Sequence, residues 1–162
     1  MRRLRFVLLL LIVAASCGYS ARALLPSHIK RVCIPTFDNE TTRYGIEQSV
    51  TTSVTDAFVA DGRLSVVSEG EADAMLRGVI VKYEKGPLTF DRAQTVDEFR
   101  LEVTVAVQFE DLRESKVLWK ESGFRAWKSF TEVEGGASED EALADAIATL
   151  ASDIVSRTLE GW

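Results

Sequence analysis

The sequence predicts an α/β fold, an α+β two-layer sandwich with two amphipathic helices on one face of a mixed, largely antiparallel sheet of four to five strands. Residues 99–110 alternate apolar and polar side chains with the period of a half-buried strand. Residues 44–61 and 138–159 instead repeat apolar side chains every three to four positions, as helices do. Neither helix can bury its apolar stripe alone, so we expect both to lie on the apolar face of the sheet.

Three elements are expected in the first part of the folded chain. Residues 29–35 have the composition of a strand that the final proline ends, because proline cannot donate a backbone hydrogen bond. Residues 38–42 form a polar turn. Residues 44–61 form a helix that Gly62 stops, and residues 64–67 form a short extended segment. The apolar stripe of this helix consists of Ile46, Val50, Val54 and Phe58.

The middle of the chain predicts an antiparallel meander. Residues 75–84 are rich in valine and isoleucine, and we expect Gly86-Pro87 to close this strand. Residues 88–95 connect it to the next predicted strand, residues 99–110, which has the clearest strand pattern in the sequence. A further strand is expected over 116–128, in which the alternation shifts at Ser122-Gly123 and so predicts a β-bulge.

The last element is the helix with the clearest start signal. Ser138 and Glu141 have the spacing of a capping box, in which the serine hydroxyl and the glutamate carboxylate each accept from the other residue's backbone N–H. Three acidic residues in the first turn also suit the helix dipole. The apolar stripe runs through Leu143, Ala146, Ile147, Leu150, Ile154, Val155 and Leu159.

The first residues have the pattern of a bacterial lipoprotein export signal. Three arginines precede an apolar run of 10 residues, 6–15, which is too short to span a bilayer because a membrane helix needs roughly 20 residues. Small residues then lead to Cys17. We expect cleavage before Cys17 and a diacylglycerol and a further acyl chain such as palmitate on this residue, which together give effectively permanent anchoring. Gly18 at the next position favours the outer membrane.

A plain secretory signal is the alternative, and Cys17 would then be available for a disulfide with Cys33. Cys33 lies in an apolar run, where we expect a buried thiol that packs as a small apolar side chain. The expected organisation is a signal peptide at 1–16, a lipidated tether at 17–28 and a single α/β domain at 29–162. Apart from the lipid on Cys17, no cofactor is expected.

Composition excludes several classes of function. Without its signal the chain carries 16 basic and 25 acidic residues, a net charge of −9. The absence of a basic cluster argues against nucleic acid as a partner. An acidic domain also does not bind an anionic membrane by charge alone, so the lipid must hold the chain on the periplasmic face of the outer membrane.

The sequence predicts neither an enzyme nor a metal site. His28 is the single histidine and lies in the tether, and the chain has no G-x-S-x-G or H-E-x-x-H motif. The adjacent carboxylates Glu139 and Asp140 are explained as residues of a helix start. We therefore expect a binding or assembly role.

Several segments, in this order along the chain, carry a resemblance to a known family. They are Cys17–Tyr19, Ile34–Thr41, Gly45–Glu47 with Val50-Thr51, Ala72-Asp73 with Leu76–Gly78, and Val117–Trp119. Together with the closing amphipathic helix, they resemble the LptE family, lipoproteins of lipopolysaccharide transport to the outer membrane. The family fold, two helices on a mixed sheet, agrees with the fold predicted above.

The resemblance implies a subunit that sits as a plug inside the outer-membrane β-barrel protein LptD, helps to assemble it and can bind lipopolysaccharide. It also implies a basic ligand contact in the connection before the longest strand, for which Arg92 is the counterpart. An arginine fork suits the phosphates of lipid A. Lys85 and Lys128 are expected near the same end of the sheet. A second basic contact after the last strand has no counterpart, because residues 132–141 are acidic.

A stand-alone lipoprotein that binds a small amphipathic ligand at the periplasmic face is the alternative function. It requires an apolar cavity between the sheet and the helices. We expect large side chains such as Phe58, Phe99 and Trp119 to fill that space instead. Trp127 is expected to pack in the core or on a face of the sheet.

Overall fold

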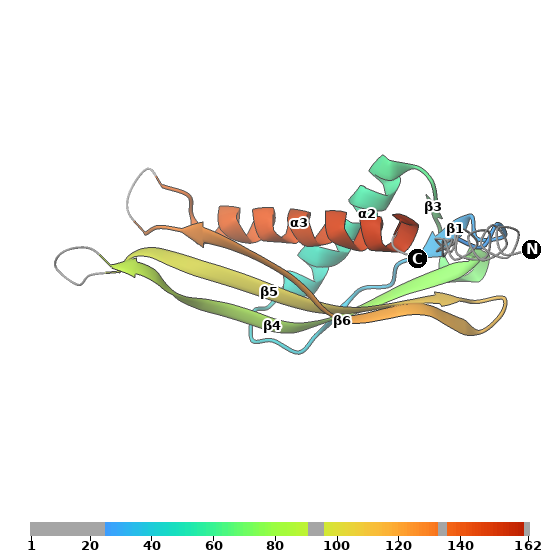
Figure 1. Cartoon of the computed structure of the whole chain (residues 1–162), viewed down its shortest axis with the longest axis horizontal. Coiled ribbons are helices and arrows are strands. Elements are labelled where there is room, and N and C mark those ends of the chain that lie inside the picture. The colour runs from blue at the N-terminus through green and yellow to red at the C-terminus, as the bar shows by residue number, and fades with distance from the viewer. Residues whose placement is uncertain (1–24, 91–95, 133–135, 161–162) are drawn as a thin grey trace, which may run out of the picture.

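The fold was obtained as a computed structural model, which describes residues 25–90, 96–132 and 136–160. Two α-helices lie against one face of a six-stranded sheet, so the predicted fold class is confirmed (Figure 1). The elements are β1 (Arg31–Cys33), β2 (Asp38–Asn39), α2 (Ile46–Asp61), β3 (Ser65–Val66), the short 3-10 helix η2 (Glu69–Glu71), β4 (Ala74–Phe90), β5 (Val96–Asp111), β6 (Lys116–Phe130) and α3 (Glu139–Glu160).

The sheet has the strand order β3-β1-β4-β5-β6, and β2 pairs separately with β4. The strands β4, β5 and β6 form the predicted antiparallel meander. The three short strands β1, β2 and β3 all pair in parallel, which makes the sheet mixed. With 16 residues at about 3.3 Å each, β5 extends for roughly 50 Å, and the molecule is elongated along this direction (Figure 1).

Both helices have the predicted apolar stripes and termini. In α2 the four stripe residues are buried, and Gly62 ends the helix at φ 75°, where its N–H donates to the Phe58 carbonyl at 3.1 Å. In α3 the capping box is formed, because the Glu141 N–H donates to Ser138 Oγ at 3.3 Å and the Ser138 N–H donates to Glu141 Oε2 at 2.8 Å. Neither described helix is long and apolar enough to cross a membrane.

The core lies between the helices and the inner face of the sheet. Every second residue of β5 from Leu101 to Phe109 contributes to it, and Leu101, Val103 and Val105 are fully buried. Cys33 is a free thiol, 8% exposed, and burial raises its pKa, as expected for a cysteine that packs as an apolar side chain. The register of β5 and β6 shifts between Val105 and Val107, which confirms the predicted bulge at Ser122-Gly123.

The predicted end of β4 was wrong. The strand continues through Gly86-Pro87 to Phe90, and Pro87 pairs opposite Phe99. A proline is tolerated here because, within the described residues, this part of β4 has no strand neighbour on the side away from β5, so the missing donor costs no ladder hydrogen bond.

The first strand also differs from the prediction. It covers only Arg31–Cys33, and the expected polar turn contains the two-residue strand β2. Pro35 interrupts the pairing, and the chain then rejoins the sheet beside Val79 and Ile80 of β4. The two-residue strands β2 and β3 account for the sheet having six strands.

Candidate functional site

Networks of polar side chains lie at two ends of the domain. Figure 1 shows that the elements carrying them lie at opposite ends of the elongated fold. At the first end, here called the anchor-side pole, the start of β1 meets the start of β4 and the β5–β6 turn. At the second end, here called the distal pole, the far end of the β4–β5 hairpin meets the start of α3. The tether enters at the anchor-side pole, because it precedes Ile29 in sequence.

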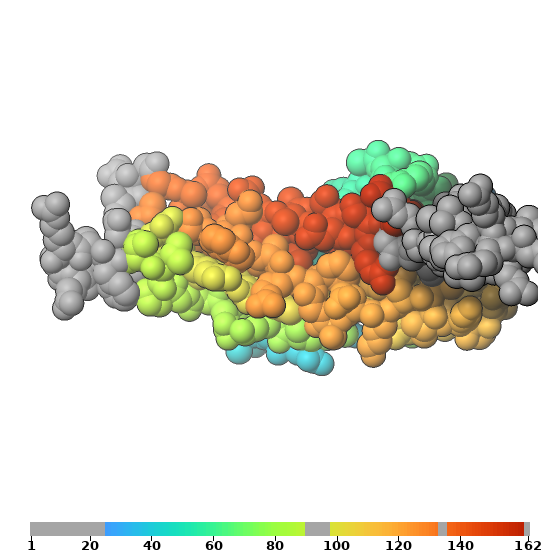
Figure 2. Space-filling model, in the orientation of Figure 1, coloured from blue at the N-terminus to red at the C-terminus, as the bar shows by residue number. Residues whose placement is uncertain are grey.

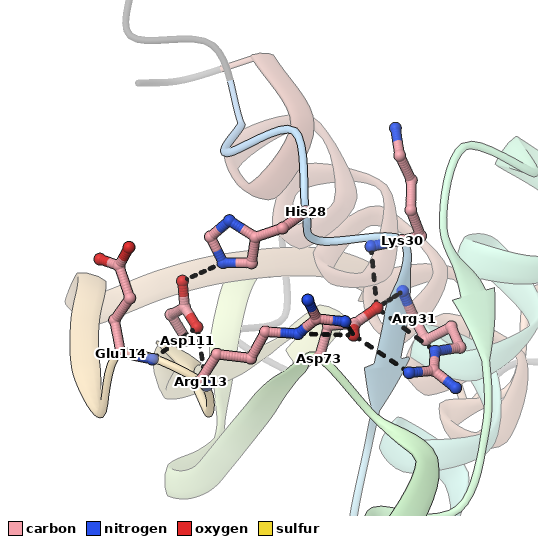
Figure 3. A network of polar contacts seen from close by, with 7 residues as sticks. All are labelled: His28, Lys30, Arg31, Asp73, Asp111, Arg113 and Glu114. Carbon is pink, nitrogen blue, oxygen red and sulfur yellow. Dashed lines mark hydrogen bonds and ion pairs between the residues drawn. The ribbon is translucent and has the colours of Figure 1, made fainter.

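The centre of the anchor-side pole is Asp73, a carboxylate only 2% exposed (Figure 3). Its oxygens accept from the guanidinium of Arg31, with Nη2 at 3.1 Å, and from that of Arg113, with Nη2 at 2.6 Å. They also accept from the backbone N–H groups of Lys30 and Arg31 at 3.2 and 3.1 Å. These contacts, the Arg31 side chain first, hold the pKa of Asp73 far below its usual range.

A second buried carboxylate, Asp111, accepts a hydrogen bond from His28, the last residue of the predicted tether. It accepts from His28 Nε2 at 2.6 Å and from the backbone N–H groups of Arg113 and Glu114 at 2.9 and 3.1 Å (Figure 3). Burial by itself raises the pKa of Asp111, but these hydrogen bonds outweigh it and the pKa is lowered. Residues 28–31 are thereby tied by hydrogen bonds to two distant parts of the chain.

His28, Asp111 and Glu114 also offer three possible metal-ligand atoms within 4.8 Å of one another. Since His28 and Asp111 already satisfy each other, we assign this cluster a structural role. The sequence analysis places His28 in the tether, names Asp73 only within the resembling segment Ala72-Asp73, and assigns no role to Asp73 or Asp111. The only available signal was a single aspartate in an apolar setting, as in Ala72-Asp73-Ala74.

At the distal pole, Lys85 lies against two stacked aromatic rings. Its Nζ is 5.0 Å from the ring centroid of Phe99 and 4.9 Å from that of Phe130, and the ring centroids are 5.3 Å apart. The ammonium also pairs with Glu139 at 3.0 Å and Glu132 at 3.2 Å. The hydrogen bond to Glu139 is the main reason that the pKa of Lys85 is raised.

Glu139, the first residue of α3, joins this cluster to the sheet. Its carboxylate accepts from the Tyr83 hydroxyl at 2.6 Å and pairs with Lys85, while Arg43 lies 3.6 Å away. The Tyr83 hydrogen bond is the largest of several contacts that lower the pKa of Glu139. The start of α3 is therefore fixed to β4 by a cluster that sequence reasoning explained only as a favourable helix start.

The structure places two of the four predicted site residues. Lys85 and Lys128 both pair opposite Leu101, from its two sides, so they lie at the same level near the distal pole, as predicted. Their role as ligand contacts stays a prediction. Cys17 and Arg92 lie outside the described residues. In the sequence, Arg92 falls between β4 and β5.

Tyr83→Phe tests the hydrogen bond at this cluster. It removes the hydroxyl that donates to Glu139, so we expect the pKa of Glu139 to rise toward its usual value and the domain to lose about 1 kcal/mol of stability. Carboxyl-detected NMR titration and urea denaturation measure the two effects. Tyr44→Phe is the matched control, because Tyr44 is 96% exposed. Equal behaviour of the two variants would show that the hydrogen bond contributes nothing.

Solved structures of low sequence identity share this fold. A PelC dodecamer from Paraburkholderia phytofirmans has a TM-score of 0.55 at 14% identity, covering 86% of this chain and 95% of that chain. A minor lipoprotein from Acinetobacter baumannii has a TM-score of 0.54 at 18% identity, covering 84% and 92%. Lipoprotein B from Nitrosomonas europaea has a TM-score of 0.54 at 20% identity, covering 87% and 92%. These likenesses establish the fold alone.

No curated protein sequence matches the chain. The family model described as "LptE: Lipopolysaccharide-assembly" matches residues 29–158. The match begins at the buried residue Ile29, just before β1, and ends in the last turn of α3, so it spans both layers of the domain. The chain therefore belongs to the LptE family of lipopolysaccharide assembly.

Proposed function

We propose that this chain is a non-enzymatic lipoprotein of the outer membrane that plugs an LptD-like β-barrel and helps to assemble it during lipopolysaccharide transport. The observation that carries the proposal is the family match over residues 29–158, which includes every strand of the described domain, all of α2 and all but the last two residues of α3. Cleavage before Cys17 and its lipidation supply the anchor on the periplasmic face of the membrane.

The shape of the domain supports a plug. A strand of roughly 50 Å is longer than the hydrocarbon core of a bilayer, about 30 Å, so the domain is long enough to extend through the lumen of a barrel. The buried networks at Asp73 and Asp111 fix where the tether leaves the domain. The described chain therefore starts at the end of the domain opposite the distal pole.

The candidate contacts for lipopolysaccharide are Lys85 and Lys128 at the distal pole and Arg92, which lies outside the described residues. Guanidinium and ammonium groups are suitable donors to the phosphates of lipid A. Lys85 must exchange its pairing with Glu139 and Glu132 for a phosphate, which weakens its attraction for the ligand. Arg92 therefore remains the first residue to substitute in a binding experiment.

The alternative, a stand-alone carrier of a small amphipathic ligand, has less support. It requires an apolar cavity between the sheet and the helices. In the described part of the chain this space contains Phe58, Leu101 and Trp119, each at most 5% exposed. A carrier would need these side chains to surround a cavity, but they pack against one another in one core.

Affinity purification of the tagged, lipidated chain from outer membranes tests the proposed function. We expect a β-barrel protein of the LptD kind to co-purify in equal amount, because a plug is enclosed by its partner. Cys17→Ala is the control, since it removes the lipid and leaves the folded domain unchanged. This variant should be absent from the membrane fraction, and much less barrel protein should co-purify with it.

Recovery of the lipidated chain alone, in detergent that keeps barrels intact, would contradict the plug role. It would leave an anchored binding domain, and the search would turn to its ligand.

A further inference from the structure

The sheet has one long edge that no strand covers. Within the described residues, β6 pairs with β5 on one side and with no strand on the other. The uncovered side runs along a strand of 15 residues, and the atoms of β6 (orange) lie open on the face seen in Figure 2, below α3 (red). A free edge presents unpaired backbone N–H and C=O groups, which are a template for another strand.

The other edges of the sheet are protected by their length or composition. On the far side the edge strand β3 is only two residues long. The part of β4 beyond Ile80 also lacks a neighbour on that side among the described residues, and it contains Pro87, which has no N–H to offer an incoming strand. The sequence of β6 contains no proline. Of these edges, β6 is the one that remains open to pairing.

The regular part of this edge is its C-terminal half. Phe124–Phe130 pairs with Phe99–Val105 without a register shift, whereas the bulge at Ser122-Gly123 separates it from the first half of β6. These seven residues, here called the docking edge, give a continuous strand of ordinary length. An added strand would therefore find an uninterrupted ladder.

The charge of β6 selects against a second copy of this chain. The strand carries four basic residues and one acidic residue in a chain of net charge −6. Two copies of β6 side by side would bring like charges together, which is destabilising. An acidic extended segment would instead find opposite charges across the new pairing. Of the basic residues, Arg125 and Lys128 lie in the docking edge, which contains no acidic residue. Lys116 and Lys120 lie before the bulge, together with the acidic residue Glu121.

Two side chains on the outer face are already held in position beside the docking edge. Trp127 is 49% exposed, and the Arg100 guanidinium lies 4.7 Å from the centroid of its ring. Glu102, only 13% exposed, pairs with Arg100 at 2.6 Å and with Arg125 at 3.8 Å. A strand added next to β6 would place alternate side chains beside Arg125 and Trp127 at little further cost in side-chain ordering.

We propose that the docking edge, Phe124–Phe130, binds an extended acidic segment of another protein, which joins the sheet as a seventh strand. The wall strands of a closed barrel have no free edge, so a barrel partner must supply this strand from a loop or a terminus. This last identification, and it alone, rests on the proposed function. Backbone hydrogen bonds hold the added strand against β6, and contacts with Arg125 and Trp127 select which sequence binds there.

Hydrogen exchange on the native, lipidated chain tests the docking edge without any substitution. In the complex purified from outer membranes, the amides of Phe124–Phe130 that point away from β5 should exchange at least about tenfold more slowly than in the isolated chain. The stretch of β4 that contains Pro87, Lys82–Phe90, serves as the internal control, and its exchange should be unchanged. Unchanged exchange at both edges in the presence of the partner would overturn the proposal.

A charge reversal tests the selectivity. Arg125 is 62% exposed, so Arg125→Glu leaves the fold intact, and we expect it to reduce the recovered partner by about tenfold. Lys82→Glu makes the same charge change on the outer side of β4 and should alter recovery by less than about twofold. If the two variants behave alike, charge at the docking edge does not select the partner.

The outcomes separate this inference from the proposed function. If a barrel partner is recovered but amide exchange at the docking edge is not slowed, the proposed seventh strand is refuted and the plug role stands. Protection by a protein that is not a barrel keeps the seventh strand and refutes the plug. If exchange is slowed in a homodimer, or if no partner is recovered, the proposal that an acidic segment of another protein binds the docking edge is refuted.

Discussion

Gly78→Ala is expected to destabilise the domain by about 1–3 kcal/mol, since it adds a methyl group to a filled core. A Cβ at this position would lie 2.1 Å from Cε2 and 2.3 Å from Cδ2 of Phe37. The Phe37 ring is 2% exposed and packed between the sheet and α2, so it cannot simply rotate away. Urea denaturation followed by circular dichroism measures the loss.

Gly86→Ala is the matched control on the same strand. A Cβ at Gly86 meets nothing within 4 Å, so its effect should stay within about 0.5 kcal/mol. A second check is a double-mutant cycle of Gly78→Ala with Phe37→Leu. The smaller leucine side chain should recover part of the stability that Gly78→Ala loses. Additive effects in this cycle would mean that the ring and the new methyl group do not compete for space.

Asp73→Ala is expected to have the largest effect of any substitution at the anchor-side pole, lowering the melting temperature by roughly 5–10 °C. It removes the acceptor of two guanidinium groups and two backbone N–H groups at once. Asp73→Asn keeps the size and one oxygen but loses the charge, so it should retain part of the stability. Differential scanning calorimetry of the three proteins at pH 7 gives this ranking.

The same carboxylate predicts how stability depends on pH. Arg31 and Arg113 hold the pKa of folded Asp73 below the value of about 3.9 for an unfolded chain. Its contribution is therefore complete above that unfolded value and is lost as the pH falls toward the folded value. The melting temperatures of the wild type and of Asp73→Ala should approach each other as the pH falls below about 4. A constant difference across this range would show that the charge of Asp73 is not the source of the effect.

Local patterns in the sequence by themselves determined much of this protein. The helix stripes, the capping box at Ser138 and Glu141 and the bulge at Ser122-Gly123 follow from the sequence because each depends on residues within one or two turns or on one strand. The family resemblance was also present in the order of short segments and is confirmed by the match over 29–158. The lipid on Cys17 and the contact at Arg92 remain predictions from sequence alone.

Tertiary structure alone decided the features that depend on distant neighbours. Pro87 was expected to end β4, but it lies on a side of the strand where no partner needs its N–H. His28 is 83 residues from Asp111, and Arg31 is 42 residues from Asp73, so no periodicity could pair them. The open edge of β6 is likewise a property of the strand order. Period and propensity report only what a residue prefers locally, whereas burial of a charge or exposure of an edge depends on which segment folding brings beside it.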